Sequence, residues 1–330
     1  FGCKAGQDLN AGDRNILIGL QAGENLTTGG NNIYMGAFAG GDKTTGDYNI
    51  ALGLSAGKAN EGSCNVFAGK YAGRDNTTGN YNVFLGLDAG KTVTTGSDNI
   101  ALGQLSMGAG TVTGAANIAL GKESAKSLTS GYQNVFIGCK AGYYSLGNAY
   151  SVFIGNSAGY HNDSGNDNVF IGNYTGCGSA SGTINAGCNA AIVYGAGRKL
   201  TIGTFNTFMG KDAGMCISTG SENIALGCSA LKGSATPGDN TGTNNIALGQ
   251  NAGSSITSGS SNILIGQNAG DAVTTASNHV AIGKDALTTE DTLSGSVAIG
   301  YEALKLQNNG NGNTAIGCQA CAAVVTGGGN

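Results

Sequence analysis

The segment Asn134–Gly142 reads Asn-Val-Phe-Ile-Gly-Cys-Lys-Ala-Gly, and the segment Ser151–Gly159 reads Ser-Val-Phe-Ile-Gly-Asn-Ser-Ala-Gly. The same pattern, an apolar triplet closed by glycine and followed by a small pair, recurs along nearly the whole chain of 330 residues. Self-similarity at a short fixed period is typical of a solenoid, in which each repeat buries its apolar side chains against the next. The sequence therefore predicts a repeat array.

The repeat unit is Asn-h-h-h-Gly-x-x-Ala-Gly-x-x-x-Thr-Thr-Gly-x-x, where h is apolar, and we number its positions 1 to 17. Nearly every step between first positions is 17 residues, give or take one. The first positions fall at Asn15, Asn32, Asn49, Asn65, Asn82, Asn99, Asn117, Asn134, Ser151, Asn168, Asn206, Asn223, Asn245, Asn262, His279, Ser296 and Asn313.

The array divides into residues 1–171, a degenerate stretch at residues 172–205, and a continued array at residues 206–330, together one elongated domain. Within the degenerate stretch, Ala191–Gly195 is interpreted as one weak unit. The 22-residue step from Asn223 to Asn245 implies an insertion, expected as a surface loop at residues 234–238, which hold the only proline. Because residues 1–6 match the end of a repeat and Asn330 opens another, we expect this chain to be an excerpt of a longer one.

Each unit predicts a strand, a turn, a short second strand and another turn. The triplet is mostly β-branched or aromatic, which favours a strand, and three consecutive apolar residues predict burial on both strand faces. Glycine at position 5 indicates positive φ or a close approach between coils. The predicted fold is thus all-β: a parallel β-solenoid or β-roll of about 18 coils.

Asparagine at position 1 is expected to stack on its copies in neighbouring coils, so that the side-chain amides form a ladder along one corner. The residues assigned to this corner ladder are Asn15, Asn32, Asn49, Asn82, Asn99, Asn134 and Asn262.

Positions 3 and 9 follow a volume rule: where position 3 is large, position 9 is glycine, and where position 9 is larger, position 3 is alanine. Ala51 with Gly57 and Ala247 with Gly253 are small at both, and the unit centred on Val193 departs from the rule. Close packing explains the rule if the two positions touch, either within one coil or across a subunit boundary. The predicted packing or oligomer contacts are Phe67, Phe84, Phe136, Phe153, Phe170, Phe208, Gly73, Gly90, Gly142, Gly159, Gly176 and Gly214.

Positions 2 and 4 face one way along the strand and position 3 faces the other, but the sequence leaves open which side is internal. The outer apolar stripe would drive association in water, and a second copy of the chain is the expected cover.

Composition excludes several classes of protein. The net charge is −4 with only 16 Lys and Arg, which argues against nucleic-acid binding. No apolar run approaches the roughly 20 residues that span a membrane, so no membrane insertion is expected. Glycine-rich stretches lack the Gly-Lys-Ser/Thr ending and the strand–helix context of nucleotide sites. No cofactor, metal ligand set or catalytic residue is predicted.

The repeats resemble those of two families. Asn313–Gly317 and Ser296–Leu304 are similar to the head repeats of trimeric autotransporter adhesins, a parallel β-roll of three chains, and to the repetitive shaft of bacteriophage tail fibres. The resemblance implies a parallel homotrimer at the cell or virion surface, supporting attachment to a host or surface. A glycan or protein receptor would be bound by regions outside this chain.

Nine cysteines favour the phage fibre, which is assembled in a reducing compartment, over a secreted adhesin. Cys3, Cys139, Cys228 and Cys318 follow the position-5 glycine and are expected to be small apolar fillers. Cys177 and Cys188 flank the irregular stretch and could form a disulfide.

Of the two histidines, His279 replaces Asn at a repeat corner, which we interpret as a structural substitution.

The function that the repeats and the resemblance favour is the structural shaft of a homotrimeric fibre. The alternative is an ice- or carbohydrate-binding solenoid using threonine arrays such as Thr27-Thr28 and Thr77-Thr78. An enzyme is disfavoured because the carboxylates are scattered.

Overall fold

The computed structural model describes residues 1–42, 45–178, 185–234, 240–289, 294–307 and 312–323. It contains eighteen strands in two compact units, residues 1–164 and 165–330, which are described separately. None of the described residues belongs to a helix long and apolar enough to cross a membrane.

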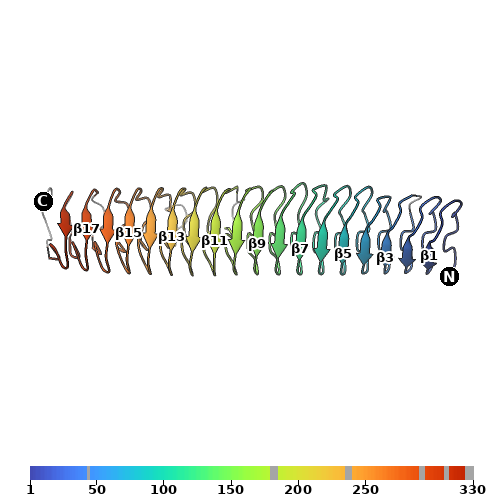
Figure 1. The fold of residues 1–330 in the computed structure, drawn as a ribbon, viewed down its shortest axis with the longest axis horizontal. Helices are drawn as coiled ribbons and strands as arrows, with labels where there is room; N and C mark the ends of the chain where they lie inside the picture. The colour runs from blue at the N-terminus through green and yellow to red at the C-terminus, as the bar shows by residue number, and fades with distance from the viewer. Residues whose placement is uncertain (43–44, 179–184, 235–239, 290–293, 308–311, 324–330) are drawn as a thin grey trace. The chain divides into compact units, whose positions relative to one another are not determined.

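Each coil contributes one parallel three-residue strand, which pairs in register with the strands of adjacent coils (Figure 1). The first unit holds β1 (Ile16–Ile18), β2 (Ile33–Met35), β3 (Ile50–Leu52), β4 (Val66–Ala68), β5 (Val83–Leu85), β6 (Ile100–Leu102), β7 (Ile118–Leu120), β8 (Val135–Ile137) and β9 (Val152–Ile154). The second holds β10 (Val169–Ile171), β11 (Ala190–Ile192), β12 (Thr207–Met209), β13 (Ile224–Leu226), β14 (Ile246–Leu248), β15 (Ile263–Ile265), β16 (Val280–Ile282), β17 (Val297–Ile299) and β18 (Thr314–Ile316). The parallel β-solenoid predicted from the repeat is confirmed.

The second strand predicted for each coil does not form in the described residues, where it is reduced to two isolated bridges, Val93 with Val112 and Tyr132 with Ala149. The backbone there still donates hydrogen bonds to the next coil, as from the Thr77 N–H to the Thr94 carbonyl oxygen (2.8 Å). Turn residues around glycine keep this side from extending into a continuous strand. The result is one narrow sheet per unit, closed by hydrogen-bonded turns.

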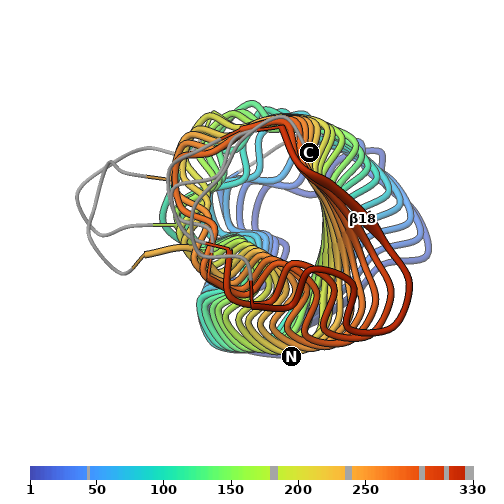
Figure 2. The same cartoon turned by 90° about the vertical axis from the view of Figure 1, so that its left-hand side faces the viewer.

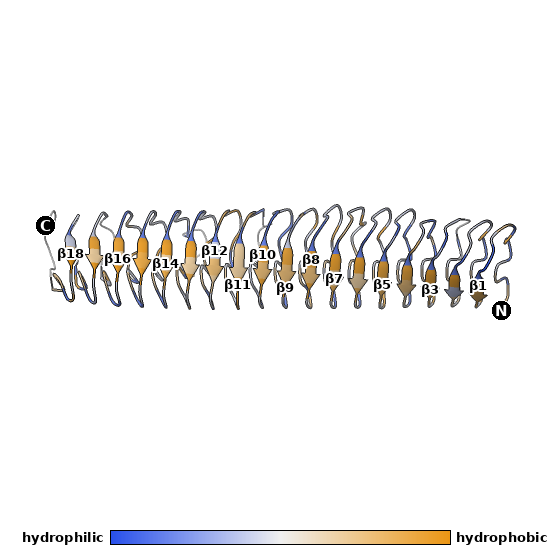
Figure 3. Ribbon diagram, in the orientation of Figure 1, coloured by the Kyte–Doolittle hydropathy of each residue, from blue (hydrophilic) through white to orange (hydrophobic). Residues whose placement is uncertain are grey.

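The interior is filled by position 3, so the internal face of the strand is settled. Position 3 is buried in seventeen of the eighteen strands, with only Leu17 of β1 partly exposed, while positions 2 and 4 are partly or largely exposed. In Figure 2 the coils of each unit follow one another around a shared interior. In Figure 3 most strands are coloured hydrophobic.

Position-5 glycines allow the coils to stack. A Cβ built on Gly138, at φ +133°, would lie 2.5 Å from the carbonyl oxygen of Gly155 in the next coil. Both parts of the prediction for this glycine, positive φ and close approach, are therefore confirmed. The same relation recurs along each unit, for example between Gly249 and Gly266.

The degenerate unit was placed in the wrong register by the sequence pattern. Ala190 pairs with Thr207 and Ile192 with Met209, which makes Asn189 position 1 and Val193 position 5. Val193 holds the left-handed corner at φ 87°, which is unusual for a β-branched residue. Position 3 is then Ala191 rather than Val193, and this coil no longer departs from the volume rule.

Strand register is kept even where coil length changes. Successive strands are 16 residues apart between β3 and β4, 18 between β6 and β7, 21 between β10 and β11, and 22 between β13 and β14. The proline-containing insertion expected at residues 234–238 lies outside the described residues except for Ser234. Length differences are absorbed without altering the sheet.

Candidate functional site

The predicted phenylalanine–glycine pairs form the core of the coils. All six phenylalanines are completely buried, and a Cβ built on Gly73 would lie 2.5 Å from the ring of Phe67. Positions 3 and 9 therefore touch within one coil. The phenylalanines are packing residues and not oligomer contacts, because their side chains point inward.

In the two coils where positions 3 and 9 are both small, a side chain from the following coil fills the space. A Cβ on Gly57 would lie 2.6 Å from the ring of Phe67, and one on Gly253 would lie 2.7 Å from the side chain of Leu264. A large position-3 side chain thus reaches back over the preceding coil and fills the space left by Ala51 and Ala247. The volume rule extends over two successive coils.

The asparagine corner ladder is present, and its side chains bond mainly to backbone groups rather than only to one another. Asn32 Oδ1 accepts from the backbone N–H of Asn49 (2.8 Å), and Asn32 Nδ2 donates across its coil to the Gly46 carbonyl oxygen (2.9 Å). The same bonds join Asn82 to Asn99 (2.9 Å) and to Gly96 (2.9 Å). Each buried asparagine side chain therefore bonds to the next coil through its oxygen and to the opposite corner through its nitrogen. These bonds satisfy buried backbone N–H and C=O groups that are not paired by the strands.

His279 takes part in this ladder, which confirms its interpretation as a structural substitution. Its Nδ1 accepts from the backbone N–H of Ser296 (3.1 Å), and its own N–H donates to Asn262 Oδ1 (3.0 Å). The imidazole thus replaces the asparagine oxygen, and its side chain is completely buried.

All nine cysteines are free, so the disulfide considered for Cys177 and Cys188 does not form. The four cysteines after the position-5 glycine are not fillers of the interior: Cys3, Cys228 and Cys318 are exposed and Cys139 is half-buried. Position 6 points outward once the chain has turned at the glycine.

The thiols differ in burial, and we expect their reactivity to differ accordingly. Burial raises the pKa of Cys216 and of Cys177, whereas Cys188 is exposed. A raised pKa lowers the thiolate fraction at pH 8, and the thiolate is the nucleophile. We expect Cys188 to react with a disulfide reagent at least tenfold faster than Cys216, measured by peptide mapping over time. Similar rates in the folded protein would contradict this, and equal rates in urea are the control.

The threonine pairs do not form a free array. Thr77 Oγ1 donates to the Thr94 carbonyl oxygen (3.1 Å) and Thr94 Oγ1 to the Val112 carbonyl oxygen (3.3 Å). The hydroxyl of the first threonine in these pairs therefore joins adjacent coils, and only the second threonine is exposed, as at Thr78. This weakens the alternative of a threonine-based ligand surface.

Within the described ranges, no group of three His, Cys, Asp or Glu side chains is placed to hold a metal ion. Burial lowers the pKa of His161, the other histidine, so that it is mostly neutral at pH 7.

His161 belongs to an aromatic block on the coils that follow β8 and β9. Tyr143 stacks on Tyr160 (ring centroids 5.0 Å apart) and Tyr144 stacks on His161 (5.2 Å). Lys126 Nζ lies 5.0 Å from the Tyr143 ring centroid and donates to its hydroxyl oxygen (2.9 Å). Because these rings cover one another, we interpret the block as a link between coils rather than a binding surface.

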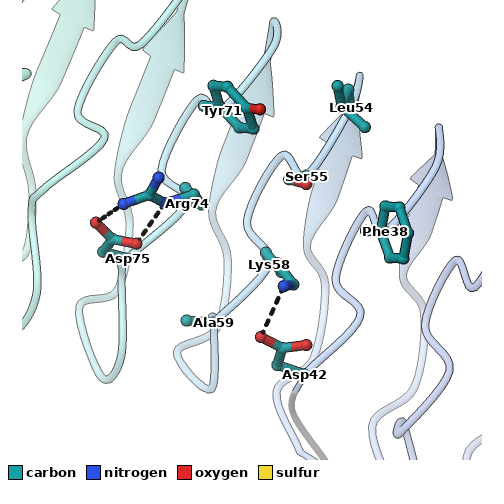
Figure 4. A pocket seen from close by; sticks show the side chains of 9 residues that line it. All are labelled: Phe38, Asp42, Leu54, Ser55, Lys58, Ala59, Tyr71, Arg74 and Asp75. Carbon is teal, nitrogen blue, oxygen red and sulfur yellow. Dashed lines mark hydrogen bonds and ion pairs between the residues drawn. The ribbon is translucent and has the colours of Figure 1, made fainter.

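A different arrangement, near the start of the first unit, places two aromatic residues two coils apart, with lysine or arginine side chains over both rings. Position 7 is Phe38 in the coil after β2, Ser55 in the coil after β3 and Tyr71 in the coil after β4. All three have left-handed φ angles of 53–62°, and backbone bonds such as Tyr71 N–H to the Leu54 carbonyl oxygen (2.9 Å) fix their stacking. We call the hollow over Ser55, between the rings of Phe38 and Tyr71, the aromatic groove (Figure 4).

The aromatic groove is a shallow, open hollow of about 450 Å³ with a rim of paired charges. Lys58 Nζ lies 3.4 Å from Asp42 Oδ2, and Arg74 forms a two-pronged pair with Asp75 at 2.6 and 2.7 Å. The hydrogen bonds from Arg74 to Asp75 raise the pKa of the guanidinium. The groove thus combines apolar walls with hydrogen-bonding groups at its edge.

The repeat pattern alone did not reveal the aromatic groove. Position 7 is variable, so it carries no repeat signal. Reading it coil by coil does show aromatic, small, aromatic at Phe38, Ser55 and Tyr71.

Comparison of the chain with protein-family models, with curated proteins and with solved structures found no match.

Proposed function

We propose that this chain is the structural shaft of a self-associating fibre, most simply a parallel homotrimer. The observation that carries the proposal is the outer apolar stripe, formed by strand positions 2 and 4. Ile16 of β1 is 49% exposed and Met209 of β12 is 47% exposed, and apolar side chains occupy these positions in almost every strand. A continuous stripe of this kind is typical of an interaction surface.

A second copy is the partner that suits the stripe best. Its side chains recur at the same coil spacing of about 4.8 Å, so two stripes can interdigitate along their length. Nine strands per unit, each three residues wide, offer roughly 400 Å². Each unit thus offers about half of the roughly 800 Å² that each partner of a stable complex commonly buries.

The setting follows from the resemblance to tail-fibre shafts and adhesin heads. We place the chain at the virion or cell surface, supporting attachment through regions other than this array. The buried ladder, the buried packing pairs and the scattered carboxylates suit a structural rather than a catalytic protein.

Charge placed on the outer stripe tests this proposal. We expect the wild-type chain at micromolar concentration to show about three times its 32.5 kDa mass by light scattering. Lysine at both Ile137 and Ile154 should give a monomer, because the free-energy cost of burying two charges exceeds the stabilisation from the apolar contacts.

The matched control places lysine at Thr28 and Thr78, which are exposed on another side of the coil and should leave the mass unchanged. A wild-type monomer would contradict self-association. An unchanged mass for the Ile137→Lys, Ile154→Lys variant would show that the interface lies elsewhere.

A further inference from the structure

The coils that follow β8 and β9 bury three polar side chains, Ser145, Asn148 and Asn162, which we call the core polar cluster. We propose that this cluster binds an ordered water molecule inside the first unit. The inference concerns the interior of the chain and does not depend on the proposed self-association.

The core polar cluster is fully buried without bonds to other protein groups. Ser145, Asn148 and Asn162 are each 0% exposed. Five of their atoms, namely Ser145 Oγ and the side-chain oxygen and nitrogen of both asparagines, have no hydrogen-bond partner among the described residues. Buried polar groups are nearly always bonded either to protein or to ordered water. Five such atoms in two successive coils therefore point to bound water.

Two members of the cluster stack on each other along the unit. Ser145 and Asn162 both occupy position 12, in successive coils. The backbone bond from the Leu146 N–H to the Asp163 carbonyl oxygen (3.0 Å) keeps these coils in register beside them. The two side chains therefore face the same part of the interior.

The third member, Asn148, reaches the same place from position 15, which is glycine in most coils. In the preceding coil, a Cβ built on the position-15 residue Gly131 would lie 2.8 Å from the side chain of Leu128 at position 12. The Asn148 side chain thus begins next to Ser145.

A pair of asparagines elsewhere in the first unit shows how position 12 is satisfied by protein groups alone. Asn60 and Asn76 occupy this position in the coils after β3 and β4. Asn76 Nδ2 donates to Asn60 Oδ1 (2.7 Å) and to the Gly79 carbonyl oxygen (2.9 Å). Asn60 Nδ2 donates to the Gly62 carbonyl oxygen (3.1 Å). Of this pair, only Asn76 Oδ1 lacks a partner among the described residues.

Ser145 takes the place of Asn60 in the core polar cluster, and its side chain lacks the amide group that would reach the next coil. Ser145 Oγ accordingly makes no bond to Asn162. A buried water needs two to four polar partners. The cluster supplies amide donors, carbonyl acceptors and a hydroxyl that can do either. A water molecule therefore replaces the missing amide as the link between the coils.

The chemistry of the cluster favours water over an ion. All three side chains are neutral, and an ion buried among neutral groups would lose its hydration without gaining a countercharge.

A high-resolution crystal structure of the full chain locates the water. We expect solvent density within about 2.7–3.2 Å of at least two of the five atoms. Magnetic relaxation dispersion of the solvent then counts long-lived internal waters in solution. Direct hydrogen bonds among the three side chains, with no solvent density beside them, would overturn the proposal. A density peak with anomalous signal would also overturn it, because it would mark an ion.

Two reciprocal variants test the cause. The double change Ser145→Asn, Asn148→Gly recreates the arrangement of Asn60 with Gly62, so that Asn162 can bond directly to the amide introduced there. It should lose at least one long-lived water. Asn60→Ser removes the direct bond to Asn76 and should gain at least one.

The matched control is Thr78→Asn, which adds an exposed amide and should leave the water count unchanged. A double variant that folds, as judged by circular dichroism, and keeps every long-lived water would contradict the proposal. Should it fail to fold, the solvent density of the wild-type chain and the count for Asn60→Ser still decide. None of these results bears on self-association, which is read from the molecular mass.

Discussion

Replacing Gly138 with alanine should destabilise the first unit by about 3 kcal/mol. The residue sits at φ +133°, a region that costs a side chain about 1–3 kcal/mol. Its new Cβ would also lie 2.5 Å from the Gly155 carbonyl oxygen, so that the coils after β8 and β9 must separate. The measurement is urea denaturation followed by circular dichroism.

Cys139→Ala, at the next position along the chain, is the control and should change stability by less than about 0.5 kcal/mol, since its side chain lies outside the core. Amide exchange should accelerate in the two neighbouring coils first, because a repeat array transmits damage to nearest neighbours. A loss below about 1 kcal/mol for Gly138→Ala would mean that coil stacking does not need the bare backbone.

Exchanging the large and small members of one packing pair should be tolerated, although each half of the exchange is not. Phe136→Ala alone should cost about 3–5 kcal/mol through the cavity that it leaves. Gly142→Leu alone should cost about 3 kcal/mol, because its Cβ would overlap the Phe136 ring and its φ is left-handed.

The double variant should lose only about 1–2 kcal/mol, far less than the sum of the two single changes. It recreates the natural pair of Ala298 with Leu304, whose φ of 51° shows that leucine can hold this corner. Thermal melts of the four proteins give the coupling. A double variant no more stable than Phe136→Ala would refute the pairing of positions 3 and 9.

The sequence predicted the solenoid well because its main constraints are local and repeated. Glycine at position 5 and the paired volumes at positions 3 and 9 each reflect a contact inside one coil or with the next. Such contacts recur at fixed spacing, so comparing the chain with itself reveals them. The sequence could not show that position 3 points inward. Positions 2, 3 and 4 are all apolar, so either face of the strand could have been the buried one.

The register of the degenerate coil was predicted wrongly because a residue other than glycine stands at its position 5. Gly195 was mistaken for position 5, although Val193 holds that corner and Asn189 opens the coil. A second strand was expected in each coil. Turn-forming residues there keep the backbone hydrogen-bonded to the next coil but prevent an extended strand. The aromatic groove escaped notice because it depends on what differs between coils and not on what they share.

Strands keep their register across steps of 16, 18, 21 and 22 residues. Each coil therefore has a strand whose length is fixed and a connecting segment whose length can change by several residues. An engineer could graft a foreign peptide into the tolerant side of any chosen coil and display copies at a regular pitch of about 4.8 Å per coil. Evolution has the same freedom: new surface loops can arise there by insertion without a compensating change elsewhere.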